Sequence, residues 1–294
     1  MLSRTLRRTA RALGLDVRRY RSTNGDPTTT LYDELYSAET LARKPFYNVG
    51  AGKFRHPHWT NVDHPSAWYA EHQRDQALLA HDLMSGEPLP IDADSAELIF
   101  TSHTMEHVTD EAAAHFFGEA HRTLRPGGIL RVTVPDADLF YRALLRRDRR
   151  FDNLPRIYDT PEKARAICMD RPASEFSCQQ LFLWRIASSV SVHHLDGSPQ
   201  RMTDEALDEA LATLPLDQVL DGCTSKCDLE VQRRHPGNHI NWWNAEKLTA
   251  MLEAAGFGEV YHSGYGQSAS PLLRDTQYFD CTNPWMSVYV EAVK

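Results

Sequence analysis

Phe46-Tyr-Asn-Val-Gly-Ala-Gly-Lys-Phe-Arg-His-Pro-His-Trp-Thr-Asn-Val-Asp63 is the stretch that best predicts the fold. An apolar strand runs into Gly50-Ala51-Gly52, and a second short strand ends on Asp63. Glycines at the end of a strand let the backbone approach a ligand that a Cβ atom would keep away. A carboxylate at the tip of the next strand is placed to accept both hydroxyls of a ribose. The same pattern also occurs in ordinary turns, so the nucleoside site that it predicts depends on the motifs downstream.

Composition excludes several classes of protein. With 294 residues, 41% hydrophobic and 24% charged, the chain can form one large domain, or one domain with a long insertion. No run approaches the ~20 apolar residues needed to span a bilayer. A formal charge of −8 argues against a nucleic-acid binder. Five cysteines without a C-x-x-C pair do not indicate a disulfide framework, so we expect a reducing cytoplasm.

The N-terminal segment has the opposite charge. Residues 1–22 contain seven arginines and a single acid, Asp16, with leucines at helical spacing. The pattern predicts a basic amphipathic helix, followed by a polar linker that reaches residue 30 and a helix over 31–44. Contact with a membrane surface, contact with a partner, a mitochondrial presequence and a solvated leader helix all remain open.

Strand-like and helical segments alternate after this leader, which predicts a parallel sheet with crossover connections. A helix over 110–124 has apolar residues at helical spacing and ends at Arg125-Pro126-Gly127-Gly128. A second helix is expected over 244–255, closed by Gly256. The predicted strands are 46–49, 60–62, 77–81, 97–102, 129–134, 260–262 and 286–293.

The strand pattern disappears between Phe140 and His235. This stretch is helical in pattern and too long for a loop, so we interpret it as an inserted helical cap. We therefore divide the chain into a leader and linker (1–44), a first sheet half (45–139), a cap (140–240) and a helix and strands that complete the sheet (241–294).

Five ordered motifs carry a resemblance to a known family. They are Asn48-Val-Gly-Ala-Gly52, Asn61-Val-Asp63, His81-Asp-Leu83, Leu98-Ile-Phe-Thr-Ser-His-Thr-Met-Glu-His107 and Arg122-Thr-Leu-Arg-Pro-Gly-Gly-Ile-Leu-Arg-Val-Thr-Val-Pro-Asp136. In this order they resemble the class I S-adenosylmethionine-dependent methyltransferases that act on small molecules. The resemblance implies an α/β, Rossmann-like sheet, mostly parallel with an antiparallel last strand, with S-adenosylmethionine as the cofactor.

The resemblance also implies roles for individual residues. The 50–52 turn would bind the methionine end of the cofactor, Asp63 the ribose, and Asp82 the adenine amino group, with Leu83 against the ring. The expected cofactor-binding residues are Asn48, Gly50, Ala51, Gly52, Asp63, Asp82, Leu83, Ser102 and His103.

Two departures from the family pattern are present. Asn48 replaces the usual acid, and Phe54 replaces the third glycine. Only ten residues separate Gly52 from Asp63, so the first helix must be reduced to a turn. This shortened form is similar to a subset of bacterial methyltransferases found with sugar and polysaccharide assembly enzymes. The C-terminal residues Gly266-Gln-Ser268, Arg274 and 287–291 are similar to that subset too.

Methyl transfer to a hydroxyl requires an acceptor for its proton, and a histidine suits neutral pH. His103, Glu106 and His107 follow the 97–102 strand at the sheet edge where ligands bind. His107 or His103 is the candidate base, although Glu106 and His107 can equally cap the following helix. A divalent metal on His103, Glu106 and His107, completed by His194 or His239, is the alternative. The spacing resembles the Glu-x-x-Glu-His pattern of small-RNA 2′-O-methyltransferases.

A second set of metal-type ligands is Cys223, Cys227, His235 and His239, which suits zinc by type but also fits free thiols and surface histidines. Sugar binding instead favours polar groups beside aromatic faces. The candidates for the acceptor site are His194, His239, Trp242, Trp243, Gln267 and Arg274, with Arg185 and His193 as further polar groups; the tryptophans can equally be core residues.

The sequence thus predicts an O-methyltransferase that acts on a sugar or glycan hydroxyl. A methyltransferase of small natural products or phenols, and an inactive cofactor-binding scaffold, are the alternatives. Nucleic acid is not expected as a substrate because the catalytic half is acidic.

Overall fold

The computed structural model describes residues 27–294, and the chain divides into two compact units at residues 42 and 43. Helices α2 (Pro27–Leu35) and α3 (Ala38–Ala42) belong to the first unit. The single helix expected over 31–44 is therefore interrupted, and α3 begins where the Ser37 hydroxyl accepts a hydrogen bond from the Thr40 amide. The predicted basic helix over 1–22 lies outside the described residues.

The second unit is built on a seven-stranded sheet with the order β3-β2-β1-β4-β5-β7-β6. Strands β1 to β5 pair in parallel, whereas β7 is antiparallel to both β5 and β6. This is the sheet that the sequence predicts, including the antiparallel last strand. The strands are β1 (Phe46–Val49), β2 (Trp59–Asp63), β3 (Leu78–Ala80), β4 (Ala96–Ser102), β5 (Leu124–Pro135), β6 (Glu259–His262) and β7 (Ser287–Val293).

Helices α5 (Asp110–Thr123) and α13 (Ala245–Ala254) cover one face of the sheet. The Thr109 side chain caps α5 by accepting a hydrogen bond from the Ala112 amide, and the acids in its first turn suit the helix dipole. Phe116 and Phe117 of α5 are buried in the core beneath β4 and β5. Apolar residues at helical spacing therefore decide which face of α5 meets the sheet.

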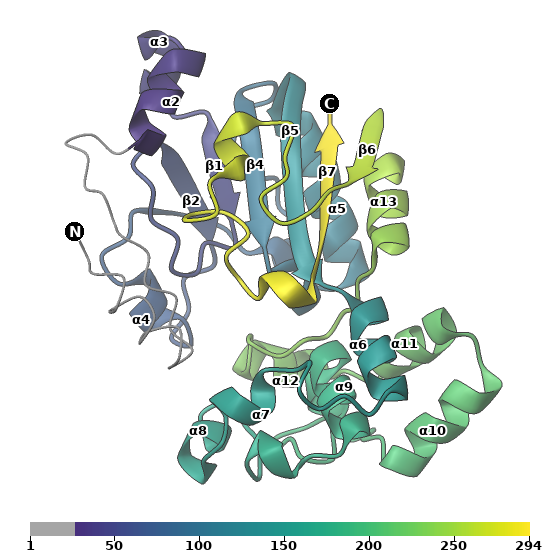
Figure 1. Ribbon diagram of the computed structural model, residues 1–294. Helices are drawn as coiled ribbons and strands as arrows, with labels where there is room; N and C mark the ends of the chain where they lie inside the picture. Colours follow the sequence, from purple (N-terminus) through teal and green to yellow (C-terminus); the bar gives the residue numbers. More distant parts are fainter. Residues whose placement is uncertain (1–26) are drawn as a thin grey trace, which may run out of the picture. The chain divides into compact units, whose positions relative to one another are not determined.

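The connection from β1 to β2 contains no helix, as its length predicts, whereas a short helix, α4 (Ala70–Gln73), lies between β2 and β3. Phe54, which stands where the family has a third glycine, packs against Trp59, Phe100 and Phe279. Phe279 comes from the connection between β6 and β7, which covers the other face of the sheet (Figure 1). This connection contains two short 3₁₀ turns, η5 (Pro271–Arg274) and η6 (Pro284–Met286).

The segment after β5 is helical, and its helices lie beyond the ends of β4 and β5 (Figure 1). Phe140, Phe182 and Leu220 belong to a core of their own in this cap. Among the described residues, no helix is long and apolar enough to cross a membrane. The cap elements are α6 (Ala137–Leu145), α7 (Leu154–Ile157), α8 (Pro161–Arg165), η3 (Ala173–Glu175), α9 (Cys178–Ile186), η4 (Ser188–Val190), α10 (Asp204–Thr213), α11 (Leu216–Thr224) and α12 (Leu229–Arg234).

Backbone hydrogen bonds hold the cap to the sheet. The amides of Ile240 and Asn241 donate to the Glu106 carbonyl, at 2.9 and 3.2 Å, and the Ala137 amide donates to the Trp243 carbonyl at 2.8 Å. Glu106 lies in η2 (Met105–His107), directly after β4. The segment that leaves the cap is therefore placed against the end of the central strand.

Candidate functional site

A cavity of about 780 Å³ opens where β1, β2 and β4 end, and α12 of the cap contributes to its wall. Its volume lies in the upper part of the roughly 300–1,000 Å³ range of ligand pockets. Ligands bind at this edge of open α/β sheets because the strand ends present their turns there. The cavity is thus where the predicted cofactor-binding residues are expected to meet.

The glycine turn after β1 lines this cavity through Gly50 and Gly52. Gly50 has φ +75°, and a Cβ atom built on it would lie 2.0 Å from the Thr104 hydroxyl oxygen. Gly52 has φ +51°, and a Cβ atom built on it would meet nothing within 4 Å. Gly50 is therefore required for packing, whereas the space beside the Cα atom of Gly52 is open; the Gly52 amide donates to Asp63 and its carbonyl accepts from Gln76.

Two carboxylates line the same cavity, Asp63 at the end of β2 and Asp82 just after β3. Asp63 accepts hydrogen bonds from the amides of Gly52, at 3.2 Å, and His64, at 2.8 Å. Asp82 accepts one from the amide of Met84, at 2.9 Å, and Leu83 lines the cavity beside it. The strand ends hold both acids as hydrogen-bond acceptors.

Three other predicted cofactor residues do not line the cavity. Asn48 is buried and donates to the side chain of Asn61 at 3.3 Å, and Ala51 is also buried. The Ser102 hydroxyl accepts a hydrogen bond from the Thr133 hydroxyl at 2.7 Å. These residues hold the strand ends in place beneath the turn. His103, in contrast, lines the cavity.

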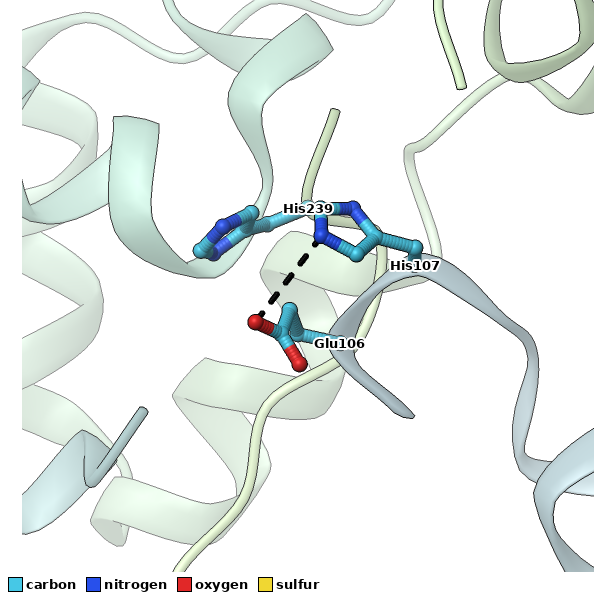
Figure 2. Close-up of side chains that lie close together, drawn as sticks. All are labelled: Glu106, His107 and His239. Atoms are coloured by element: carbon cyan, nitrogen blue, oxygen red, sulfur yellow. Dashed lines mark ion pairs between the residues drawn. The ribbon is translucent and has the colours of Figure 1, made fainter. Parts of the chain in front are cut away.

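Glu106 lies at the centre of a group of imidazoles. Its side chain is almost fully buried, with Oε1 3.2 Å from Nδ1 of His103 and 3.8 Å from Nε2 of His107. His239, near the C-terminal end of the cap segment, lies beside them. Its ring packs edge-on against that of His107 (Figure 2). Glu106, His107 and His239 each have a ligand-type atom, and these atoms lie within 4.8 Å of one another.

The electrostatics of this group follow from burial and from the neighbouring rings. Burial by itself would raise the pKa of Glu106, but His103, His107 and His239 outweigh it and lower that pKa to about 2. Burial and the neighbouring His107 lower the pKa of His239 to about 3. At neutral pH the group therefore holds an ionised carboxylate next to a neutral His239.

The structure also places residues in the cavity wall that the sequence analysis did not single out. Tyr69 and Thr104 come from the sheet side, and Gln232 and Arg233 come from α12. Thr104 follows His103 directly, so its position was readable from the strand end. No pattern in the sequence marked the two α12 residues, because the cap brings them there only in the folded chain.

The residues predicted to bind the acceptor do not line the cavity. Trp243 is buried against Phe117, and Trp242 is buried in the cap core, where it donates to Asp221. His194 is fully buried. Of the remaining polar candidates, Arg185 pairs with Asp152, His193 lies beside Asp170, the Gln267 carbonyl accepts from Arg131, and Arg274 donates to the carbonyl of Ser268.

The Cys223, Cys227, His235 and His239 set does not form one cluster in the described chain. His235 lies 3.2 Å from the sulfur of Cys168 and 3.1 Å from Asp196, whereas Cys223 contacts Met202. Between residues 27 and 294, only Glu106, His107 and His239 meet as a group of three or more potential ligands.

Comparisons with known proteins agree with the fold. Residues 59–132 match the family model of a methyltransferase domain. No curated protein sequence matches the chain.

Solved structures that match the chain include three bacterial or archaeal proteins. An S-adenosylmethionine-dependent methyltransferase from Mesorhizobium loti is 13% identical over 90% of this chain and 96% of its own, with a TM-score of 0.37. A possible histamine N-methyltransferase from Thermotoga maritima is 14% identical over 90% and 96%, with a TM-score of 0.37. A methyltransferase from Archaeoglobus fulgidus is 9% identical over 92% and 100%, with a TM-score of 0.38. Likenesses of this size carry no information about the substrate.

Proposed function

We propose that this chain, a class I S-adenosylmethionine-dependent methyltransferase, methylates a hydroxyl group of a sugar or glycan. The observation that carries the proposal is the set of residues that line the cavity described above. Carboxylates suited to a nucleoside, Asp63 and Asp82, share that wall with the imidazole of His107 and with polar residues of the cap. Cofactor and acceptor can therefore meet in one cavity.

Asp63 and Asp82 are assigned to the cofactor. Each carboxylate already accepts amide hydrogen bonds from its own turn, which leaves further lone pairs for ribose hydroxyls and an adenine amino group. The free space beside Gly52, where a side chain would lie, suits the methionine end. The sulfonium methyl is then presented to an acceptor bound beneath α12.

The polar residues of the cap support a polyhydroxylated acceptor. Gln232 and Arg233 from α12, together with Glu111 from α5, give the cavity both donors and acceptors of hydrogen bonds. A sugar ring uses both kinds of partner, because each hydroxyl donates and accepts. In-line attack of one hydroxyl oxygen on the methyl group forms the C–O bond as the C–S bond breaks, and sulfur keeps the electron pair. The acceptor proton leaves toward the imidazole of His107, which lines the cavity, or toward solvent where a bound metal ion activates the hydroxyl.

Calorimetric titration with S-adenosylhomocysteine tests the cofactor assignment. Loss of two charge-assisted hydrogen bonds, each about 1.5–3 kcal/mol, predicts that Asp63→Ala binds at least ~100-fold more weakly. Asp92→Asn, which removes an exposed carboxylate outside the cavity, is the matched control and should bind as the wild type does. Unchanged affinity in the Asp63 variant would remove the ribose assignment.

A radiolabelled methyl donor tests the acceptor class. The wild-type protein is incubated with monosaccharides, nucleotide sugars and oligosaccharides in one series, and with catechols and simple phenols in another. Labelled product only in the sugar series supports the proposal. Turnover confined to the phenol series would replace the sugar with a phenolic acceptor.

A further inference from the structure

We infer that Glu106, His107 and His239 form a binding site for one divalent metal ion. They offer one carboxylate oxygen and two imidazole nitrogens within 4.8 Å of one another, close enough for small side-chain movements to bring all three around one ion. Figure 2 shows the three side chains gathered at the junction of the sheet edge and the cap. The role of this ion in methyl transfer rests on the proposed function, whereas the site itself rests on geometry.

The hydrogen bonds of the two histidines prepare them as ligands. Nδ1 of His107 lies 2.8 Å from the carbonyl oxygen of Asn238, and Nδ1 of His239 lies 2.7 Å from that of Arg185. A carbonyl oxygen only accepts, so each Nδ1 must carry the proton. This leaves the lone pair on Nε2 of each ring, and metal-binding histidines are oriented in the same way by an acceptor on their other nitrogen.

The carboxylate of Glu106 is buried beside imidazoles but lacks well-formed hydrogen bonds. The residue is 1% exposed, and neither of its side-chain oxygens accepts a well-formed hydrogen bond, although Nδ1 of His103 lies 3.2 Å away. Buried polar atoms normally have such a partner, and a buried carboxylate without one is costly. A divalent cation between Glu106 and the two imidazoles supplies the missing partner.

Hydrogen bonds hold the three ligands together, although His239 is more than a hundred positions from the other two in the sequence. The amides of Ile240 and Asn241 both donate to the carbonyl of Glu106, and the side chain of Gln232 donates to the carbonyl of His107. These contacts place His239 opposite η2 without any help from a metal. A site held in this way is largely formed in advance, so little ordering opposes binding.

His103 is not a member of this ligand set. Its Nε2 is within 2.8 Å of the Ser287 hydroxyl, and its Nδ1 faces Glu106. It therefore supports the carboxylate from the sheet side, and His239, predicted as one of two residues that could complete the site, is the third ligand in this set. Two nitrogens and one oxygen suit manganese, iron(II), cobalt or zinc better than calcium.

Three protein ligands leave coordination positions open, as in catalytic rather than structural metal sites. His107 lines the cavity, so an acceptor hydroxyl bound there can reach the ion. An ion held there would lower the pKa of that hydroxyl, whose proton would pass to solvent. The alkoxide oxygen would then bond to the methyl carbon as the C–S bond breaks and sulfur keeps the electron pair.

Metal binding by the purified full chain tests this inference without cofactor or acceptor. The protein is stripped with a chelator and titrated with cobalt(II) and zinc(II), with visible absorbance and calorimetry as readouts. We expect one ion per chain in the wild type and at least ~100-fold weaker binding in His107→Gln and His239→Gln. His121→Gln, whose ring lies against Phe257 outside the group, should bind as the wild type does.

Circular dichroism and thermal unfolding confirm that each variant is folded. Absence of stoichiometric binding to the folded wild type, or binding by both histidine variants as tight as by the wild type, would overturn the inference. Failure of the proposed function is distinguishable, because it would appear as lost S-adenosylhomocysteine binding or lost sugar turnover with metal binding intact. Retained turnover in a protein that binds no metal would leave the proposed function standing and remove the metal site.

Discussion

Replacing Gly50 with alanine probes the turn that joins β1 to the cavity. Gly50 has φ +75°, and an added Cβ would lie 2.0, 2.5 and 2.7 Å from Oγ1, Cγ2 and Cβ of Thr104. Carbon atoms pack favourably at about 3.5–4.0 Å, so Thr104 or the turn must move. The substitution therefore combines a strained backbone with a steric overlap.

The expected loss of stability is about 2–5 kcal/mol. The left-handed backbone costs an alanine about 1–2 kcal/mol, and forcing an extra methyl group into a packed site costs about 1–3 kcal/mol more. Gly52→Ala is the matched control, because Gly52 also has positive φ but its Cβ meets no atom within 4 Å. That variant should lose only the backbone contribution, about 1–2 kcal/mol.

Urea denaturation of the two variants measures the difference, and the double variant Gly50→Ala/Thr104→Gly isolates its cause. Thr104→Gly removes all three atoms that the new Cβ would meet. The double variant should therefore be more stable than the sum of the single changes predicts, by about 1–3 kcal/mol. Equal stability of Gly50→Ala and Gly52→Ala, or strict additivity in the cycle, would refute the reasoning.

Three further substitutions test the fold and its pH dependence. Arg131→Met leaves the buried carboxylates of Asp280 and Glu291 without their cation, so urea denaturation should show a loss of about 3–5 kcal/mol; a loss below ~1 kcal/mol would contradict this ion pairing. Burial lowers the pKa of His194 to about 4, below its unfolded value of about 6.5, so the folded state loses stability as the pH falls from 6.5 toward 4. His194→Gln should make that loss smaller by up to ~3 kcal/mol, and an unchanged pH profile would show that His194 does not contribute. Thr109→Ala removes the cap of α5 and should lower the free energy of unfolding by about 1 kcal/mol, whereas an unchanged denaturation midpoint would exclude a stabilising cap.

The strands, the glycine turn and the two carboxylates were predictable because their signals are local. Gly50 and Gly52 stand at a strand end, and Asp63 and Asp82 each stand beside another strand end, so strand recognition alone places all four at one sheet edge. The short connection between Gly52 and Asp63 likewise predicted that no helix fits there, and the structure contains none. Side-chain periodicity and turn chemistry act over a few residues, which is why they can be read from the chain.

The sequence by itself thus determined the sheet, its crossover helix α5 and the positions of the cofactor-type residues. Only the tertiary structure decided which histidine meets Glu106 and His107, and which tryptophans are core. His239 reaches them because the cap closes onto η2 through the hydrogen bonds of residues 240 and 241, and Trp242 and Trp243 are buried in the same docking. These contacts join residues more than a hundred positions apart, and no local periodicity encodes how a helical insertion that leaves β5 packs back against the end of β4.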